Sequence, residues 1–163
     1  MIQYLALLLS AGIVGVDQLI KVIVIDQLAP YGSYPIIQDI FHFTYVENRG
    51  AAFGMMAGHD WLLIWATALV LLVAIALIMM GKIKTPILLF SVAVVIGGGV
   101  GNLIDRVYRG FVVDYIHVKV INFAVFNFAD VCVTLGTVAL IGYLLFHELR
   151  SKKKEPKGEK KRA

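Results

Sequence analysis

Four long apolar segments dominate the pattern of hydrophobic and polar positions along this chain of 163 residues. Each approaches the roughly 20 residues that an α-helix needs to cross a bilayer. The clearest is 61–80, in which Thr67 is the only polar side chain. We expect spans at about 2–25, 61–80, 87–104 and 127–147. The pattern therefore predicts an all-α membrane protein in which residues 1–150 form a single domain of four transmembrane helices.

The composition agrees with a membrane protein and narrows its partners. The chain is 60% hydrophobic, well above the half that is usual for soluble domains. Eight of its fifteen Lys and Arg residues lie in 150–162, so the net positive charge belongs to one short tail, 151–163. Such a tail is typical of a cytoplasmic segment beside anionic lipid, and we expect no nucleic-acid partner. The single cysteine, Cys132, excludes an intramolecular disulfide.

The distribution of basic residues also predicts the orientation. The link 81–85 carries Lys82 and Lys84, whereas the long link 26–60 carries Arg49 as its only basic residue. The positive-inside rule thus places both termini and the 81–85 link in the cytoplasm. The link 106–127, with three basic residues, runs against this trend. We expect links 26–60 and 106–127 outside.

The link 26–60 has a structure of its own. Its segment 40–46 partly alternates, with Phe41, Phe43 and Tyr45 on one face. Pro and Gly residues precede it, which indicates a short β-sheet on the membrane surface. The following segment, 48–54, is rich in small residues and predicts a short interfacial helix.

The carboxylates converge on one side of the membrane. At 1.5 Å per helical residue, Asp17 lies about 22 Å from Ile2, and Asp105 about 27 Å from Ile87. Asp130 begins the fourth span and Asp114 lies in the outer link. Segments that run in opposite directions therefore bring these aspartates to the same leaflet, where an ionisable residue marks a functional site by default.

Two of these aspartates have candidate basic partners in the sequence. Asp17 and Lys21 are four residues apart on one helix face, and we favour a structural ion pair over a catalytic role. Asp105 beside Arg106 has the same structural interpretation. The glycines that precede Asp105 permit either close helix packing or backbone contact with a substrate; they are Gly97, Gly98, Gly99 and Gly101.

Asp114 and Asp130 differ because neither has a basic residue within four positions. Burial and mutual repulsion would raise the pKa of one of them and produce a pair that shares a proton. Such a pair can activate water and polarise a carbonyl, with Asn102 and Asn127 orienting it. The alternative is that Asn127 or Asp130 is simply a helix N-cap.

Other catalytic classes have weaker support. The chain lacks a His-Glu-x-x-His zinc motif and a Gly-x-Ser-x-Gly elbow. His117, three residues after Asp114, is a weak candidate metal ligand, and Cys132 lies in an apolar run that disfavours its thiolate. We expect no metal and no cofactor.

Five short motifs occur in order along the chain: Asp17-Gln18-Leu19-Ile20-Lys21, Asn48-Arg49-Gly50-Ala51-Ala52-Phe53, Gly97 to Arg106, Val112-Val113-Asp114-Tyr115 and Phe126-Asn127-Phe128-Ala129-Asp130. At these motifs the chain resembles the bacterial lipoprotein signal peptidases (signal peptidase II), which are four-span aspartic peptidases. It departs from the usual pattern at Ile20, Ala124 and Val131.

The resemblance implies that Asp114 and Asp130 are the catalytic pair and that a surface β-cradle and a short helix cover the site. It also implies that four polar side chains line the site: Asn48, Asn102, Arg106 and Asn127. We place Gly98, Asp105, Asp17 and Lys21 among the supporting residues.

The implied activity is removal of the signal peptide from lipid-modified prolipoproteins. Water would attack the peptide carbonyl just before the diacylglyceryl cysteine, at the outer leaflet of the bacterial cytoplasmic membrane. The expected partners are these precursors and membrane lipids. The alternative is a small carrier or channel whose outer carboxylates bind a cation; it is disfavoured because the inner halves of the spans are almost free of charge.

Overall fold

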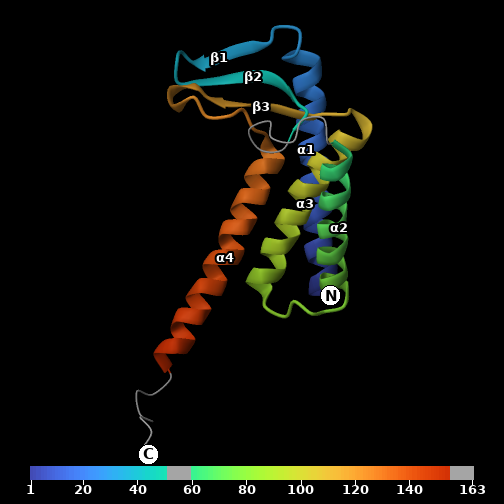
Figure 1. Cartoon of the computed structure of the whole chain (residues 1–163), viewed down its shortest axis with the longest axis vertical. Coiled ribbons are helices and arrows are strands. Elements are labelled where there is room, and N and C mark those ends of the chain that lie inside the picture. The colour runs from blue at the N-terminus through green and yellow to red at the C-terminus, as the bar shows by residue number, and fades with distance from the viewer. Residues whose placement is uncertain (51–59, 155–163) are drawn as a thin grey trace, which may run out of the picture.

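Four long helices and a small sheet make up the part of the chain that the computed structural model describes, residues 1–50 and 60–154 (Figure 1). The helices are α1 (Ile2–Gln27), α2 (Asp60–Met79), α3 (Pro86–Tyr108) and α4 (Phe128–Lys154). All four are long and apolar enough to cross a membrane. The expected class, a four-span helical membrane protein with a small sheet, is confirmed.

Helices α3 and α4 extend several residues beyond the expected spans. Helix α3 continues to Tyr108, so Asp105 and Arg106 lie in its last turns. Helix α4 continues to Lys154, past the expected start of the tail. Residues 155–163 lie outside the described residues, and the division into one domain and a basic tail stays a prediction.

The sheet has three antiparallel strands in the order β1-β2-β3. Strands β1 (Ser33–Ile37) and β2 (Phe41–Asn48) come from the link where a sheet was expected. Strand β3 (Val112–Val118) was missed by the sequence reasoning, which assigned it to an outer link. The 3₁₀ turn η2 (Lys119–Ile121) follows it. The expected interfacial helix falls mostly on residues 51–59, outside the described residues.

The sheet lies at one end of the helix bundle (Figure 1). Helices α1 and α3 end at this side and α4 begins there, whereas the N-terminus and the link between α2 and α3 lie at the opposite end. Opposite chain directions thus bring the polar ends of three helices together, as the sequence predicted. Which end faces the cytoplasm stays a prediction.

Helix α3 is the centre of the bundle and contacts the other three helices. Its glycines permit these contacts: a Cβ on Gly98 would overlap the carbonyl oxygen of Ala129 in α4, and one on Gly101 would overlap the carboxylate of Asp17 in α1. Of the two interpretations of this glycine run, close packing is the one that the contacts support.

The apolar core is small because most large side chains point outward. The buried apolar cluster comes from α1, α2 and α3: Ala6, Leu71, Ile78, Leu89, Ala93 and Ile96. By contrast Leu8, Leu72 and Leu135 are each more than 60% exposed. In a membrane-spanning bundle such a surface faces lipid, so packing relies on small residues and internal polar contacts.

Candidate active site

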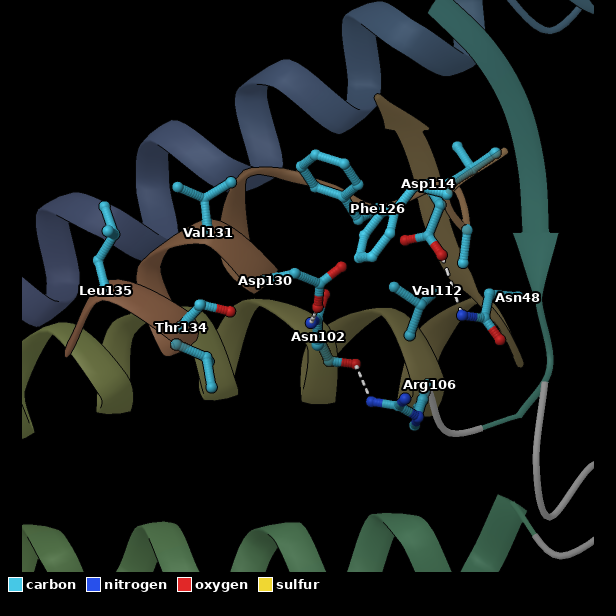
Figure 2. A pocket seen from close by; sticks show the side chains of 14 residues that line it. Asn48, Asn102, Arg106, Val112, Asp114, Phe126, Asp130, Val131, Thr134 and Leu135 are labelled. Atoms are coloured by element: carbon cyan, nitrogen blue, oxygen red, sulfur yellow. Dashed lines mark hydrogen bonds between the residues drawn. The ribbon is translucent and has the colours of Figure 1, made fainter. Parts of the chain in front are cut away.

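Polar side chains from four elements meet where the sheet joins the bundle. They line a cavity of about 500 Å³ with apolar residues of α4 and of the segment before it. Figure 2 shows the carboxylates of Asp114 and Asp130 close to this cavity, with Asn48 beside Asp114 and Asn102 beside Asp130. The polar lining residues are Asn48, Asn102, Arg106, Asp114 and Asp130.

Asp130 is held by the first turn of α4. The backbone N–H of Asn127 donates to its Oδ2 at 3.1 Å, and the backbone N–H of Asp130 donates to Oδ1 of Asn127 at 2.9 Å. This reciprocal pair is a capping box, in which Asn127 is the N-cap and Asp130 the third helical residue. The cap and the proposed site are therefore not alternatives, because the same two residues serve both.

Asp114 projects from β3 and is 1% exposed. Its Oδ2 accepts a hydrogen bond from Nδ2 of Asn48 at 2.9 Å, and its Oδ1 accepts one from Nδ2 of Asn127 at 2.7 Å. Burial raises the pKa of Asp114 from 3.8 to about 6, against the effect of the Asn48 hydrogen bond, and the negative charge of Asp130 adds to the rise. A carboxyl that keeps a proton close to neutral pH is suited to acid–base chemistry.

Asn102 and Arg106 lie one turn apart on α3. Asn102 donates through Nδ2 to Oδ1 of Asp130 at 2.8 Å. Arg106 donates to the carbonyl oxygens of Asn102 at 3.4 Å and Gly50 at 3.3 Å. Arg106 thereby connects α3 to the chain just after β2, which carries Asn48.

A second carboxylate cluster is buried behind the cavity. Nζ of Lys21 lies 3.0 Å from Asp17 and 2.9 Å from Asp105, and all three side chains are fully buried. The expected Asp17–Lys21 pair is confirmed. Asp105 is also in buried ion pairs, in agreement with its structural interpretation, and its partners are Lys21 and Arg109. Arg109 is four residues on in α3 and shares the face of Asp105.

Three contributors were missed by the sequence reasoning. Gln18 donates to Asp105, and Arg109 donates to Gln18 and to Asp105. The four-residue spacing of Asp105 and Arg109 could have revealed that pair. Tyr115 accepts the backbone N–H of Phe128 through its hydroxyl at 3.2 Å, and burial raises its pKa to about 12. No local signal indicates this last contact.

The other candidates do not join the site. His117 contacts Thr44 at 3.2 Å on the sheet. Across residues 1–50 and 60–154, no three His, Cys, Asp or Glu side chains are grouped so that they could hold a metal ion. The expectation that no metal is needed stays a prediction. Of the three departures from the family pattern, Ala124 and Val131 line the cavity, and Val131 follows Asp130 directly.

Comparison with known proteins identifies close relatives of this chain. Residues 9–146 match the family described as Signal peptidase (SPase) II. The chain is 42% identical over 151 residues to a lipoprotein signal peptidase of Clostridioides difficile, covering 91% of this chain and 99% of that protein. It is 42% identical over 144 residues to one from Caldanaerobacter subterraneus, covering 86% and 95% of the two chains.

The fold has solved counterparts as well. One bacterial membrane enzyme, determined by the in meso method, superposes with a TM-score of 0.81 at 28% identity and covers 94% of each chain. A second such enzyme superposes with a TM-score of 0.76 at 27% identity. Both the sequence match and the shared architecture extend over nearly the whole chain. This chain is a multi-pass membrane protein that belongs to the signal peptidase II family.

Proposed function

We propose that this protein is an aspartic endopeptidase that removes the signal peptide from lipid-modified prolipoproteins. The observation that carries the proposal is the pair Asp114 and Asp130, held at one apolar-lined cavity by asparagine amides. The names of the curated relatives support lipoprotein precursors as the substrate class.

In the proposed mechanism Asp130 is the base and Asp114 carries the shared proton. Asp114 is the more buried member, and its raised pKa favours the protonated form. Each of the four carboxylate oxygens accepts one hydrogen bond from the residues that the structure describes, and it retains a lone pair for water or for the shared proton. The ionised Asp130 takes a proton from water, which attacks the peptide carbonyl while Asp114 donates to the carbonyl oxygen.

Collapse of the tetrahedral intermediate then breaks the C–N bond before the lipidated cysteine. The proton on Asp130 goes to the leaving amine and the hydroxyl proton returns to Asp114, so the pair is restored. Asn48, Asn102 and Asn127 hold the carboxylates, and Arg106 fixes the chain beside Asn48. Gly98 brings α4 against α3, and the pair of Asp17 and Lys21 with Asp105 supports the ends of α1 and α3.

The surroundings of the cavity suit a substrate that is itself in the membrane. Val131, Phe126 and Leu135 line it, and Leu135 is also exposed on the lipid-facing surface of α4. We propose that the site works at the outer leaflet of the bacterial cytoplasmic membrane, with both termini in the cytoplasm and with lipids and prolipoproteins as its partners.

The test is cleavage of a diacylglyceryl precursor peptide by the purified protein. Asp114→Asn and Asp130→Asn should each lower kcat by several orders of magnitude, because loss of one member of a catalytic unit removes most of the activity of the whole unit. Asp39→Asn is the matched control, since Asp39 forms an exposed ion pair with Lys119, and it should cleave normally. Normal turnover by either Asp114→Asn or Asp130→Asn in folded protein would refute the proposed pair.

A further inference from the structure

Lys21 makes one contact that an ion pair with two carboxylates does not require. Its Nζ lies 3.0 Å from Asp17 and 2.9 Å from Asp105, and it donates at 2.8 Å to Oδ1 of Asn102. An ammonium group has three N–H donors, so the three partners use all of them. The side chain is fully buried, and solvent does not compete for these bonds.

The third contact leads directly to the proposed catalytic pair. Oδ1 of Asn102 also accepts from Nδ2 of Asn127 at 3.1 Å, while Nδ2 of Asn102 donates to Asp130 at 2.8 Å. Nδ2 of Asn127 donates in turn to Asp114 at 2.7 Å. One amide therefore separates Lys21 from Asp130, and two amides separate it from Asp114.

A buried cation determines how the Asn102 amide is oriented. Lys21 has no acceptor, so it bonds only to the oxygen end of the amide. The NH₂ end must then face Asp130, and donation to a carboxylate is one of the stronger hydrogen bonds. A flipped amide would turn its NH₂ toward an ammonium and its oxygen toward a carboxylate, which are two repulsive contacts.

We propose that Lys21 is a positioning residue for the catalytic pair, which it orients through Asn102 in addition to pairing with Asp17 and Asp105. The proposal rests on the proposed function of Asp114 and Asp130. It gives the buried ion cluster a role in the reaction: Asp17 and Asp105 hold Lys21, and Lys21 holds the amide that holds Asp130.

The charge of Lys21 acts on the pair as well. The charged or titratable groups around this network are Asp17 on α1, Asp105, Arg106 and Arg109 on α3, Asp114 and Tyr115 on β3, and Asp130 on α4. Lys21 favours ionised Asp114. Its removal alone leaves the cluster one positive charge short. Asp114 should then keep its proton to higher pH, and the alkaline limb of the pH–rate profile should move to higher pH.

Two variants separate orientation from charge. Lys21→Met removes both the donor and the charge, and its alkaline limb should shift upward by about half a pH unit or more. Lys21→Met combined with Asp17→Asn removes one charge of each sign, so the cluster stays balanced and Asp105 keeps Arg109. The double variant tests the lost hydrogen bond to Asn102 even where Lys21→Met alone does not fold.

The measurement is kcat and KM for a lipidated precursor peptide, with melting temperature recorded for each purified protein. The double variant should have a kcat at least about ten-fold below that of Asp17→Asn alone, with a KM within about two-fold of it. Lys21→Arg keeps the charge and the N–H donors. It should therefore retain most of the kcat that is lost when Lys21 is replaced by Met, and the alkaline limb of its pH–rate profile should stay at the wild-type position. Ser10→Ala removes another buried contact between α1 and α3, from Ser10 to the carbonyl of Ala93 at 2.7 Å, and should leave kcat unchanged.

The outcomes are distinct from those of the proposed function. If Asp114→Asn is inactive but the double variant keeps the kcat of Asp17→Asn, Lys21 is structural alone and this proposal is overturned. If kcat falls only in proportion to melting temperature, and Ser10→Ala falls with it, the effect is one of packing and the proposal is again overturned. Normal cleavage by Asp114→Asn would instead remove the catalytic pair itself.

Discussion

The partners of each buried aspartate decide what it can do. Asp17 and Asp105 form ion pairs with the side chains of Lys21 and Arg109. Asp114 and Asp130 are bonded by neutral amides, which orient a carboxylate without neutralising it. The same residue type therefore serves in buried ion pairs in one cluster and in the proposed catalytic pair in the other, although the two clusters are joined through Asn102.

The titration of Asp114 follows from this difference. Its pKa in the folded protein, about 6, exceeds the ordinary 3.8, so the folded protein binds more protons than the unfolded chain between these values. The free energy of unfolding should thus fall as pH rises from about 4 through about 6. Infrared spectra should show a protonated carboxyl band at pH 5 that is lost by about pH 7 and is absent from Asp114→Asn. An identical band in wild type and in Asp114→Asn would contradict the assignment, and Asp39→Asn is the control.

At the scale of elements, α3 makes the site possible by letting two helices approach it closely. Gly98 contacts the backbone of α4 one residue before Asp130, and Gly101 contacts Asp17 of α1. Asn102 and Arg106 lie on the same helix, so the contacts that assemble the bundle also set the spacing between the walls of the cavity. Without an aqueous hydrophobic effect between helices, such close contacts provide much of the association energy.

Gly98→Ala tests this link between packing and activity. The added Cβ meets the backbone oxygen of Ala129, which cannot rotate away, so α4 must shift. We expect the melting temperature to fall by several degrees and kcat to fall by about ten-fold or more. Gly142→Ala in α4 is the matched control, since a Cβ there meets nothing within 4 Å, and it should be neutral or slightly stabilising. Equal behaviour of the two variants would disprove the packing role.

For the whole molecule, the position of the site relative to the bilayer is the central property. The sheet, the cavity and the ends of α1 and α3 lie at one end of the bundle (Figure 1). The link 81–85, with its two lysines, and the C-terminal end of α4 lie at the opposite end. The positive-inside rule then predicts that the cavity lies at the outer leaflet.

Reporter fusions test this orientation. A reporter fused after Arg162 should be active only if it functions in the cytoplasm, and one inserted near Gly58 only if it functions outside. The reverse pattern would place the aspartates at the inner leaflet and contradict the proposed location.

Substrate lipidation is the second test at this scale. A signal helix alone can slide and tilt in the bilayer at modest cost, whereas two acyl chains on the cysteine add about 0.8 kcal/mol of partitioning free energy per buried CH₂. Lipidation should therefore fix the height of the scissile bond beside Asp114 and Asp130. We expect kcat/KM for the lipidated peptide to exceed that for the unmodified peptide by at least about 100-fold, measured in one detergent or lipid system. Equal values would mean that the peptide sequence alone sets specificity.

The sequence by itself determined the properties that depend on position along the chain. The length of the apolar segments identified four helices, and the spacing of four residues identified the Asp17–Lys21 pair. Because successive helices run in opposite directions, the aspartates were expected at the same end of the bundle. These signals are local in the sequence, so they can be recognised without knowing which helices and strands contact one another. The family motifs drew attention to Asp114 and Asp130 for the same reason.

Only the tertiary structure decided which distant residues become partners. It paired Asp105 with Lys21, 84 positions away, whereas the sequence had suggested the adjacent Arg106. It also made Val112–Val118 a strand, because its backbone groups pair with β2 across a long stretch of chain. The bond from Lys21 to Asn102 joins α1 to α3 and has no local signature. Pairing of this kind depends on how helices and strands pack in space, and chain position does not encode it.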